Sequence, residues 1–291
     1  MIDADLPHGF TSPDDVATGL RATGYLPDAD ISTTVFLASA LEKPLLLEGP
    51  AGTGKTDLAA SIARTTGARL IRLQCYHGID EARALYEWDY RKQLLALQAA
   101  GTGPDASLDG VFSEDFLLSR PLLEAVRAED RVVLLIDEVD QLDMETEALL
   151  LEFLADFQVT IPELGTMRAA RAPLVFLTSN DNRRLSDALK RRCLYLHISY
   201  PDAERESEII RSRVPGIDER LSMKIAETVA MLRGLDLKKR PSISESIDWA
   251  RTLLLLGATD IDEDLLIAHA NVLLKYASDI DLARETLGVR T

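Results

Sequence analysis

The chain has 291 residues but only two cysteines, and it contains no long apolar run. Cys75 and Cys193 lie far apart in the sequence and fit no metal-ligand spacing, so the sequence indicates neither a disulfide framework nor a zinc site. No stretch approaches the roughly 18 to 20 apolar residues that a membrane-spanning helix requires, and the N-terminal residues lack the basic and apolar regions of a signal peptide. We therefore expect a cytoplasmic protein without a membrane span.

Basic residues are fewer than acidic ones. The 32 lysines and arginines stand against 48 aspartates and glutamates, which gives a formal net charge of −16. Such a charge repels phosphate backbones, so non-specific binding of nucleic acid would need a local basic patch, and the sequence has only short basic clusters. Hydrophobic residues at 46% and charged residues at 27% are typical of a globular protein. The length fits one large domain, or a large and a small one.

Short apolar runs alternate with helical patterns over the first two thirds of the chain. Unbroken runs of this kind predict buried strands of a parallel sheet with helices on both faces, and hence an α/β fold. The predicted strands lie at 44–48, 70–73, 132–136, 174–177 and 194–198, and the predicted helices at 12–20, 32–41, 55–64 and 145–157.

Helical periodicity prevails beyond residue 200. We predict an α/β domain over residues 1–200 and an all-helical domain over 201–291. The segment 101–110 is rich in glycine, aspartate and serine, which predicts a mobile loop. Apolar and polar residues alternate around a turn at 157–167, which predicts a hairpin that either contacts a client protein or has no role. The predicted helices of the second domain are 203–211, 219–232, 242–256 and 262–276.

The segment 49–56 fits the pattern G-x-x-x-x-G-K-[ST] between a predicted strand and a predicted helix, which is the context that this phosphate-binding motif needs. Its glycines let the loop curl so that backbone N–H groups and the helix N-terminus surround phosphate oxygens. Lys55 adds a cation for the β and γ phosphates, and Thr56 supplies a hydroxyl ligand for Mg²⁺. The residues that we assign to nucleotide binding are Gly49, Pro50, Ala51, Gly52, Thr53, Gly54, Lys55 and Thr56.

The apolar strand at 132–136 ends in two acids, Asp137 and Glu138. Ligands of open α/β sheets bind at the carboxyl ends of the strands, so these acids can meet the phosphate-binding segment. Asp137 would hold Mg²⁺, and Glu138 would orient and deprotonate an attacking water, which favours hydrolysis over transfer to another acceptor. Two acids that merely end a strand in solvent are the alternative, and the motif at 49–56 argues against it.

A third apolar strand, at 174–177, is followed by Thr178, Ser179 and Asn180. The amide of Asn180 can hydrogen-bond both an attacking water and the γ-phosphate. Alone, this tripeptide is typical of an ordinary turn. Its position after the other two motifs favours a role in catalysis.

The segments GPAGTGKT, VVLLIDEVD, LTSN and LKRRC, in this order and followed by a helical region, resemble the AAA+ ATPases. The segments CYHGIDEARALYEWDY, FLLSRPLLEAV and DFQVTIPELGTMRA are similar to the MoxR branch of that family, in particular to its CoxD-like members. The resemblance covers nearly the whole chain. It implies an AAA+ P-loop core, a small helical lid domain, and a homo-oligomeric ring, usually a hexamer, that holds ATP and Mg²⁺ between neighbouring subunits.

The resemblance also implies roles for single residues. Lys55 and Thr56 match the Walker A loop, Asp137 and Glu138 match Walker B, and Asn180 matches sensor 1. Thr56 and Asp137 would be the residues that hold the metal.

Arginines beyond these motifs are harder to assign. Arg192 matches the arginine finger that reaches a neighbour's γ-phosphate, with Arg191 as the alternate. The alternative is a basic helix end that interacts favourably with the C-terminal end of the helix dipole, and we favour the finger. Many relatives carry a sensor 2 arginine at the start of a lid helix, but the corresponding stretch here reads RPSISE. Arg240 and Arg251 lie nearby, and we leave sensor 2 unassigned.

Aromatic and histidine residues give weaker signals. Tyr76, Tyr86, Trp88 and Tyr90 form a cluster in the sequence that is either a partner-contacting insertion or packed core. The four histidines are scattered without ligand spacing, so we expect no metal site built from them.

By resemblance, the work of the protein would be chaperone-like remodelling in the maturation of a metalloenzyme, with a partner that carries a von Willebrand factor A domain. Nothing in composition or spacing identifies the client. Three rival functions are a nucleic-acid motor or clamp-loading subunit, an ATP-gated scaffold with little turnover, and a small-molecule kinase. The net charge argues against the first and the complete pair of Walker B acids against the second. No acceptor-site signature supports the third.

Overall fold

The computed structural model of the chain describes residues 8–100 and 112–286. The segment 101–110, for which the sequence predicts a mobile loop, lies outside the described residues. The chain divides into two compact units. The sheet unit comprises the described part of Met1–Thr23, Pro27–Glu48 and Lys55–His197, and the helical unit comprises Gly24–Leu26, Gly49–Gly54 and the described part of Ile198–Thr291.

The sheet unit is built on five parallel strands. They are β1 (Leu45–Glu48), β2 (Arg69–Gln74), β5 (Val132–Asp137), β8 (Leu174–Ser179) and β9 (Leu194–His197), in the order β2-β5-β8-β1-β9. Every residue of β5 and β8 is buried, which is why these strands read as unbroken apolar runs. The predicted parallel sheet is therefore confirmed, with all five predicted strands in it.

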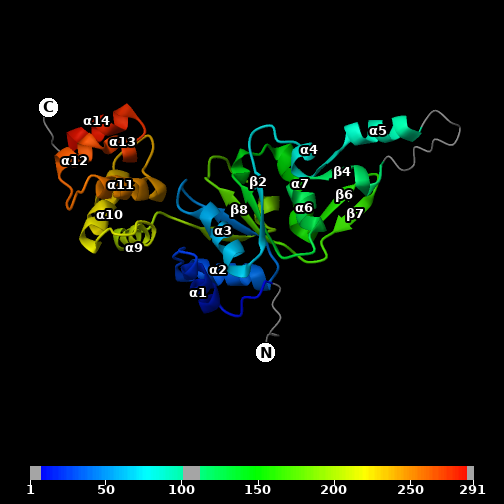
Figure 1. Cartoon of the computed structure of the whole chain (residues 1–291), viewed down its shortest axis with the longest axis horizontal. Helices are drawn as coiled ribbons and strands as arrows, with labels where there is room; N and C mark the ends of the chain where they lie inside the picture. The colour runs from blue at the N-terminus through cyan, green and yellow to red at the C-terminus, as the bar shows by residue number, and fades with distance from the viewer. Residues whose placement is uncertain (1–7, 101–111, 287–291) are drawn as a thin grey trace. The chain divides into compact units, whose positions relative to one another are not determined.

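Helices cover both faces of the sheet, as predicted for an α/β fold. In Figure 1, α1 (Pro13–Ala22), α2 (Ala29–Ala40) and α3 (Lys55–Thr66) lie on one side, and α6 (Pro121–Arg127) and α7 (Met144–Asp156) lie on the other. The first helix begins where its sequence predicts, because the Ser12 hydroxyl caps it by accepting from the Asp15 N–H at 3.1 Å. The remaining helical segments of this unit are α4 (Glu81–Ala84), α5 (Tyr90–Ala100), η2 (Glu114–Phe116), η3 (Val139–Gln141) and α8 (Asp187–Lys190).

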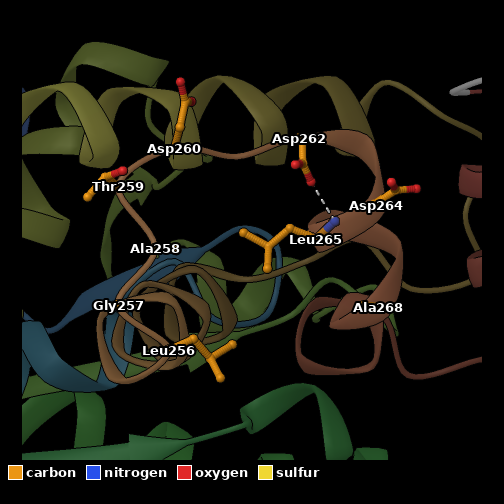
Figure 2. A pocket seen from close by; sticks show the side chains of 9 residues that line it. All are labelled: Leu256, Gly257, Ala258, Thr259, Asp260, Asp262, Asp264, Leu265 and Ala268. Carbon is orange, nitrogen blue, oxygen red and sulfur yellow. Dashed lines mark hydrogen bonds between the residues drawn. The ribbon is translucent and has the colours of Figure 1, made fainter.

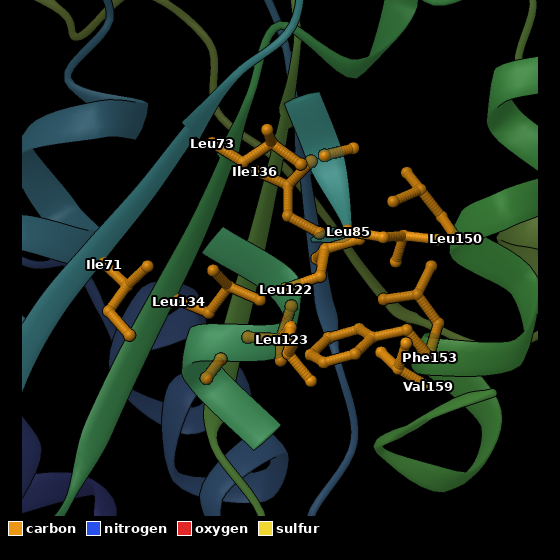
Figure 3. Close-up of a cluster of buried hydrophobic side chains, with 14 of the residues drawn as sticks. Ile71, Leu73, Leu85, Leu122, Leu123, Leu134, Ile136, Leu150, Phe153 and Val159 are labelled. Carbon is orange, nitrogen blue, oxygen red and sulfur yellow. The ribbon is translucent and has the colours of Figure 1, made fainter. Parts of the chain in front are cut away.

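One face of the sheet packs against α6 and α7 to form the larger core of this unit (Figure 3). Side chains two residues apart on a strand share a face, so β2 and β5 each present alternate residues to the helices. Each fully buried Leu, Ile or Phe stabilises the fold by roughly 1.5–3 kcal/mol. The labelled residues of this core include Ile71, Leu73, Leu134 and Ile136 from the strands and Leu122, Leu123, Leu150 and Phe153 from the helices.

Two small antiparallel pairs complete the sheet unit. The pair β6 (Gln158–Ile161) and β7 (Gly165–Arg168) confirms the hairpin predicted at 157–167. The second pair, β3 (Tyr86–Trp88) and β4 (Leu117–Ser119), was not predicted and divides the aromatic cluster. Trp88 is buried and packs edge-on against Tyr86, with ring centroids 6.4 Å apart. Tyr76 and Tyr90 are exposed, so only part of the cluster belongs to the core.

Helices make up the second unit, as the sequence predicts. They are α9 (Ala203–Arg213), α10 (Glu219–Arg233), α11 (Ile243–Leu255), α12 (Glu263–Ala268), α13 (Ala270–Leu273) and α14 (Ala277–Thr286). The prediction of a single helix over residues 262–276 was wrong. His269 has φ −119° and ψ 17°, which interrupts the helix, and Leu274 is extended and ends α13.

The helical unit also takes in segments from the first part of the chain. Residues 49–54, here called the phosphate loop, pack with this unit although they connect β1 to α3. None of the described helices combines the length and the apolar character that a membrane crossing requires.

Candidate functional site

The sheet brings the three polar motifs to one edge. Because β1, β5 and β8 are parallel, the residues that follow them emerge at the same edge. The register pairs Glu48 with Ser179 and Gln74 with Asp137, so the ends of four strands lie level there. A ligand at this edge can contact α3, β2, β5 and β8 together.

At two positions of the phosphate loop, neighbouring atoms leave no room for a side chain, so glycine is required. Gly49 has a φ of 149°, and a Cβ at this position would lie 2.1 Å from the carbonyl oxygen of Ile198. Gly52 has a φ of 75°, and its Cβ would lie 2.2 Å from that of Ser242. The Ile243 N–H donates to the Gly52 carbonyl oxygen at 3.2 Å. A side chain at either glycine would therefore displace the loop.

Lys55 and Thr56 open helix α3, directly after the loop. Lys55 is only 5% exposed. Burial lowers the pKa of its ammonium group, while the carboxylates of Asp140, Asp137 and Glu138 act in the opposite direction. The lysine is thus a desolvated cation whose charged form is favoured by three nearby carboxylates.

Asp137, at the end of β5, is buried among three donors. Thr56 Oγ1 donates to its Oδ1 at 3.0 Å, and Thr178 Oγ1 donates to the same oxygen at 2.5 Å. Arg72 Nη2 donates to Oδ2 at 2.5 Å. The carboxylate is held from three elements, α3, β8 and β2, and cannot rotate freely.

The pair Thr56 and Asp137 suits a magnesium ion. A hydroxyl and a carboxylate are the hard oxygen ligands that Mg²⁺ prefers, and Mg²⁺ usually takes few protein ligands and completes its shell with water and phosphate oxygens. The two side chains meet although they are 81 residues apart in the sequence. The residues present therefore fit the predicted metal.

Glu138 has a left-handed backbone, with φ 59° and ψ 48°. This conformation is uncommon outside glycine and is typical of residues under functional constraint. The Glu138 N–H donates to Thr178 Oγ1 at 2.9 Å, and Gln74 Nε2 donates to Glu138 Oε2 at 3.1 Å. The backbone and the carboxylate are therefore both held, one by β8 and the other by β2.

Asn180 and the two candidate finger arginines lie further along the chain. Asn180 follows β8 directly and is partly exposed at the same edge. Arg192 is half-buried, and its Nη1 donates to the Ala188 carbonyl oxygen at 2.9 Å, while Arg191 is exposed. The roles of these residues stay predictions, since each depends on a bound nucleotide or a neighbouring subunit.

Both arginines near the expected sensor 2 position, Arg240 and Arg251, are exposed. Arg251 forms an exposed ion pair with Asp248 on α11, at 3.3 Å, and Arg240 is exposed. Ser242, which caps α11, is the side chain of this region that meets the phosphate loop, at Gly52. Sensor 2 stays unassigned.

Sequence reasoning missed two residues of this site. Arg72 and Gln74 come from β2, which the sequence treats only as an apolar run. A signal was present for Gln74, because it is the polar residue that directly follows the predicted strand 70–73. Arg72 stands inside the predicted strand 70–73, but nothing in the sequence indicated its partner. Its partner became visible only when the strand order placed β2 beside β5.

A separate pocket lies in the helical unit, at the turn between α11 and α12 (Figure 2). It contains three acids, but two of them have structural partners. Asp260 pairs with Arg220 at 2.8 Å and also with Lys224. Asp262 caps α12 by accepting from the Leu265 N–H at 2.8 Å. Across the described residues no group of three His, Cys, Asp or Glu side chains is placed to hold a metal ion.

Several known proteins are similar to this chain. Protein NorQ of Paracoccus denitrificans is 24% identical over 218 residues, which cover 72% of each chain. An uncharacterized protein of Staphylococcus saprophyticus is 26% identical over 221 residues, which cover 74% of this chain and 76% of the relative. Among solved structures, the Holliday junction branch migration motor RuvB of Thermotoga maritima aligns with 94% of this chain and 70% of its own, at 17% identity and a TM-score of 0.45.

The sequence pattern of the AAA family, the ATPase family associated with various cellular activities, matches residues 45–200. The match covers more than half of the chain, from the start of β1 to just beyond β9. It includes the phosphate loop, Asp137, Glu138 and Asn180. The resemblance to AAA+ ATPases drawn from the sequence is confirmed, and the similarity to NorQ agrees with it. The chain belongs to the AAA family of ATPases.

Proposed function

We propose that the protein hydrolyses ATP with Mg²⁺ at the edge of the sheet where β5 and β8 end, and that it uses this cycle to remodel another protein. The observation that carries the proposal is the 3.0 Å hydrogen bond from Thr56 Oγ1 to Asp137 Oδ1. It joins the end of the phosphate-binding motif to the acidic strand end, so that both can act on one triphosphate.

In the proposed reaction, water attacks the γ-phosphate in line with the leaving oxygen. The N–H groups of the phosphate loop and the buried Lys55 bind the phosphates. Thr56 and Asp137 hold Mg²⁺, which supplies positive charge for the phosphate oxygens when bound. Desolvation strengthens the attraction between Lys55 and the phosphates because less water screens it.

Glu138 orients the attacking water and accepts its proton. The hydrogen bond from Gln74 Nε2 at 3.1 Å sets the direction of the Glu138 carboxylate. Its strained backbone, held by Thr178, supports the same assignment. Asn180 is assigned to the γ-phosphate and the water, as the resemblance implies.

The finer function follows the MoxR and NorQ type. We propose a homo-oligomeric ring in which Arg192 reaches the γ-phosphate held by the neighbouring subunit and stabilises charge in the transition state. The work would be chaperone-like, in the maturation of a metalloenzyme with a partner that carries a von Willebrand factor A domain. The similarity to NorQ over 72% of the chain supports this type of ATPase and does not name the client.

Two substitutions test the core of the proposal. Lys55→Ala should abolish binding of a fluorescent ATP analogue, because it removes the buried cation. Glu138→Gln should keep ATP binding but lower turnover by roughly a hundredfold or more, because an amide cannot accept the proton. Equilibrium titration and steady-state phosphate release measure the two effects.

Matched controls exist on the same unit. Lys43→Ala and Glu129→Gln make the same chemical changes at exposed positions and should leave both readings unchanged. Equal loss of ATP binding in Lys55→Ala and Glu138→Gln would contradict the separate roles. The Glu138→Gln variant, loaded with ATP, is also the form to use for co-purification from the native host. Recovery of a protein with a von Willebrand factor A domain would support the finer function.

A further inference from the structure

The carboxylate of Asp137, which is assigned to the metal, forms an ion pair with an arginine side chain of the same chain. Arg72 Nη2 lies 2.5 Å from Asp137 Oδ2. The Asp137 side chain is 5% exposed, whereas the Arg72 side chain is 52% exposed. The arginine therefore keeps much of its contact with water, while the carboxylate that it contacts is buried.

The sheet fixes this contact. In the parallel register of β2 and β5, Arg72 pairs with Leu135 and Gln74 pairs with Asp137. Arg72 and Gln74 are two residues apart and therefore share a face of the sheet. Arg72 Nη2 also donates to Gln74 Oε1 at 2.6 Å, so one guanidinium nitrogen contacts both side chains. Gln74 in turn donates to Glu138, so Arg72 is linked to both acids of β5.

We propose that Arg72 is a built-in counterion of Asp137 that competes with the divalent cation and so sets how strongly metal and nucleotide binding depend on each other. This inference rests on the proposed function and assigns Arg72 as a positioning residue of that site. A guanidinium at hydrogen-bond distance from Oδ2 partly neutralises the carboxylate, which lowers its attraction for a divalent cation.

The same charge has the opposite effect on the nucleotide. Lys55 is surrounded by the carboxylates of Asp137, Glu138 and Asp140, which also repel a polyphosphate. Arg72 offsets part of that repulsion when no metal is bound. Loss of Arg72 should therefore strengthen metal binding and weaken metal-free nucleotide binding.

A purely structural role makes a different prediction. If Arg72 only braced β2 against β5, its loss would loosen Thr56, Asp137 and Glu138 together and weaken both ligands. Opposite changes in the two affinities thus separate the counterion role from bracing.

The experiment uses the full chain with Arg72→Gln, Arg72→Lys and Arg69→Gln. Arg69 is the matched control, because it lies at the other end of β2 and pairs with Asp130 at 3.1 Å and with Glu124. Mn²⁺ binding is measured by electron paramagnetic resonance of the free ion, with the chain loaded with ADP. Binding of a fluorescent ADP analogue is measured separately in EDTA and in saturating Mg²⁺.

We expect Arg72→Gln to tighten Mn²⁺ binding by about tenfold, the size of one hydrogen bond to a charged group, and to weaken nucleotide binding in EDTA by about threefold or more. Arg72→Lys keeps the charge and should stay within about threefold of the wild type for both ligands. Arg69→Gln should change neither.

Unchanged or weaker Mn²⁺ binding in Arg72→Gln, or a parallel loss of both affinities, would overturn the inference. An equal change of the Mn²⁺ and nucleotide affinities in Arg69→Gln would also overturn it, because the effect would then follow from the net charge of the protein and not from the position of Arg72. Failure of the wild type to bind the ADP analogue under any condition would instead refute the proposed function.

Discussion

At the scale of single residues, Gly52 of the phosphate loop and Gly216, between α9 and α10, differ in what surrounds them. Gly52 and Gly216 both have a positive φ, 75° and 92°. A Cβ at Gly52 would lie 2.2 Å from the Cβ of Ser242, whereas no heavy atom lies within 4 Å of a Cβ at Gly216. Substitution by alanine therefore separates backbone strain from collision.

We expect Gly216→Ala to lower the free energy of unfolding by about 1–3 kcal/mol through backbone strain alone. Gly52→Ala should cost more than this and should also weaken ATP binding, because the loop must move away from the start of α11. Urea unfolding and titration with a fluorescent ATP analogue measure the two effects. Equal behaviour of the two variants would show that Ser242 does not restrict the loop.

Burial of His8 predicts that the free energy of unfolding depends on pH. His8 is 4% exposed, and burial, with the positive charges of Arg171 and Arg131, lowers its pKa from 6.5 to about 4. The unfolded chain takes up this proton at a higher pH than the folded chain. The contribution is therefore complete above pH 6.5 and is lost as the pH falls toward 4, by up to about 3 kcal/mol.

Replacing His8 by asparagine should flatten the pH dependence of stability between pH 7 and 4.5, since asparagine does not take up a proton. Urea unfolding at several pH values measures the slope. His77→Asn, at an exposed position, is the control and should keep the slope of the wild type. An unaltered slope in His8→Asn would rule out this histidine as the source.

At the scale of elements, a buried ion pair links three helices of the helical unit. Arg233 on α10 donates from Nη2 to Glu206 Oε1 on α9 at 2.9 Å, and Ser246 on α11 donates to the same oxygen at 2.6 Å. Arg233 Nε also donates to the carbonyl oxygen of Pro241 at 2.8 Å, next to the cap of α11. Glu206 is fully buried, so it depends on these donors.

Removing one partner leaves a buried charge without compensation. Arg233→Met should lower the free energy of unfolding by about 3–5 kcal/mol, and the double variant with Glu206→Met should recover much of this loss. Arg251→Met breaks only the exposed pair with Asp248 and should cost less than about 1 kcal/mol. Chemical unfolding followed by fluorescence and circular dichroism tests the series. A double variant no more stable than Arg233→Met would contradict the buried-charge explanation.

At the scale of the whole molecule, the role proposed for Arg192 depends on a ring of subunits. If Arg192 acts on the neighbour's nucleotide, specific ATPase activity should rise with protein concentration as the ring assembles. Arg192→Ala should then lower turnover by roughly 10³-fold or more, the contribution of an arginine finger in related reactions, while nucleotide binding to isolated subunits stays nearly unchanged. Phosphate release combined with analytical ultracentrifugation measures both.

Arg191→Ala serves as the control for this prediction, because Arg191 is the exposed neighbour of the half-buried Arg192. The larger loss in Arg191→Ala would reassign the finger. Specific activity that is independent of protein concentration, with the protein monomeric throughout, would exclude a shared site.

Local patterns in the sequence determined much of this protein. Unbroken apolar runs specified β5 and β8, because a strand covered on both faces has no polar side. The phosphate-binding motif specified the turn before α3, since only glycines at 49 and 52 fit so close to Ile198 and Ser242. The acids at 137 and 138 followed from their place at a strand end.

The tertiary structure alone decided which side chains meet. Strand order placed β2 beside β5, and this put Arg72 and Gln74 against Asp137 and Glu138. The helix predicted at 262–276 is interrupted at His269, although the local pattern there is helical throughout. Periodicity along the chain records which face of an element is buried. It does not record which element lies next to it, because that depends on contacts between residues far apart in the sequence.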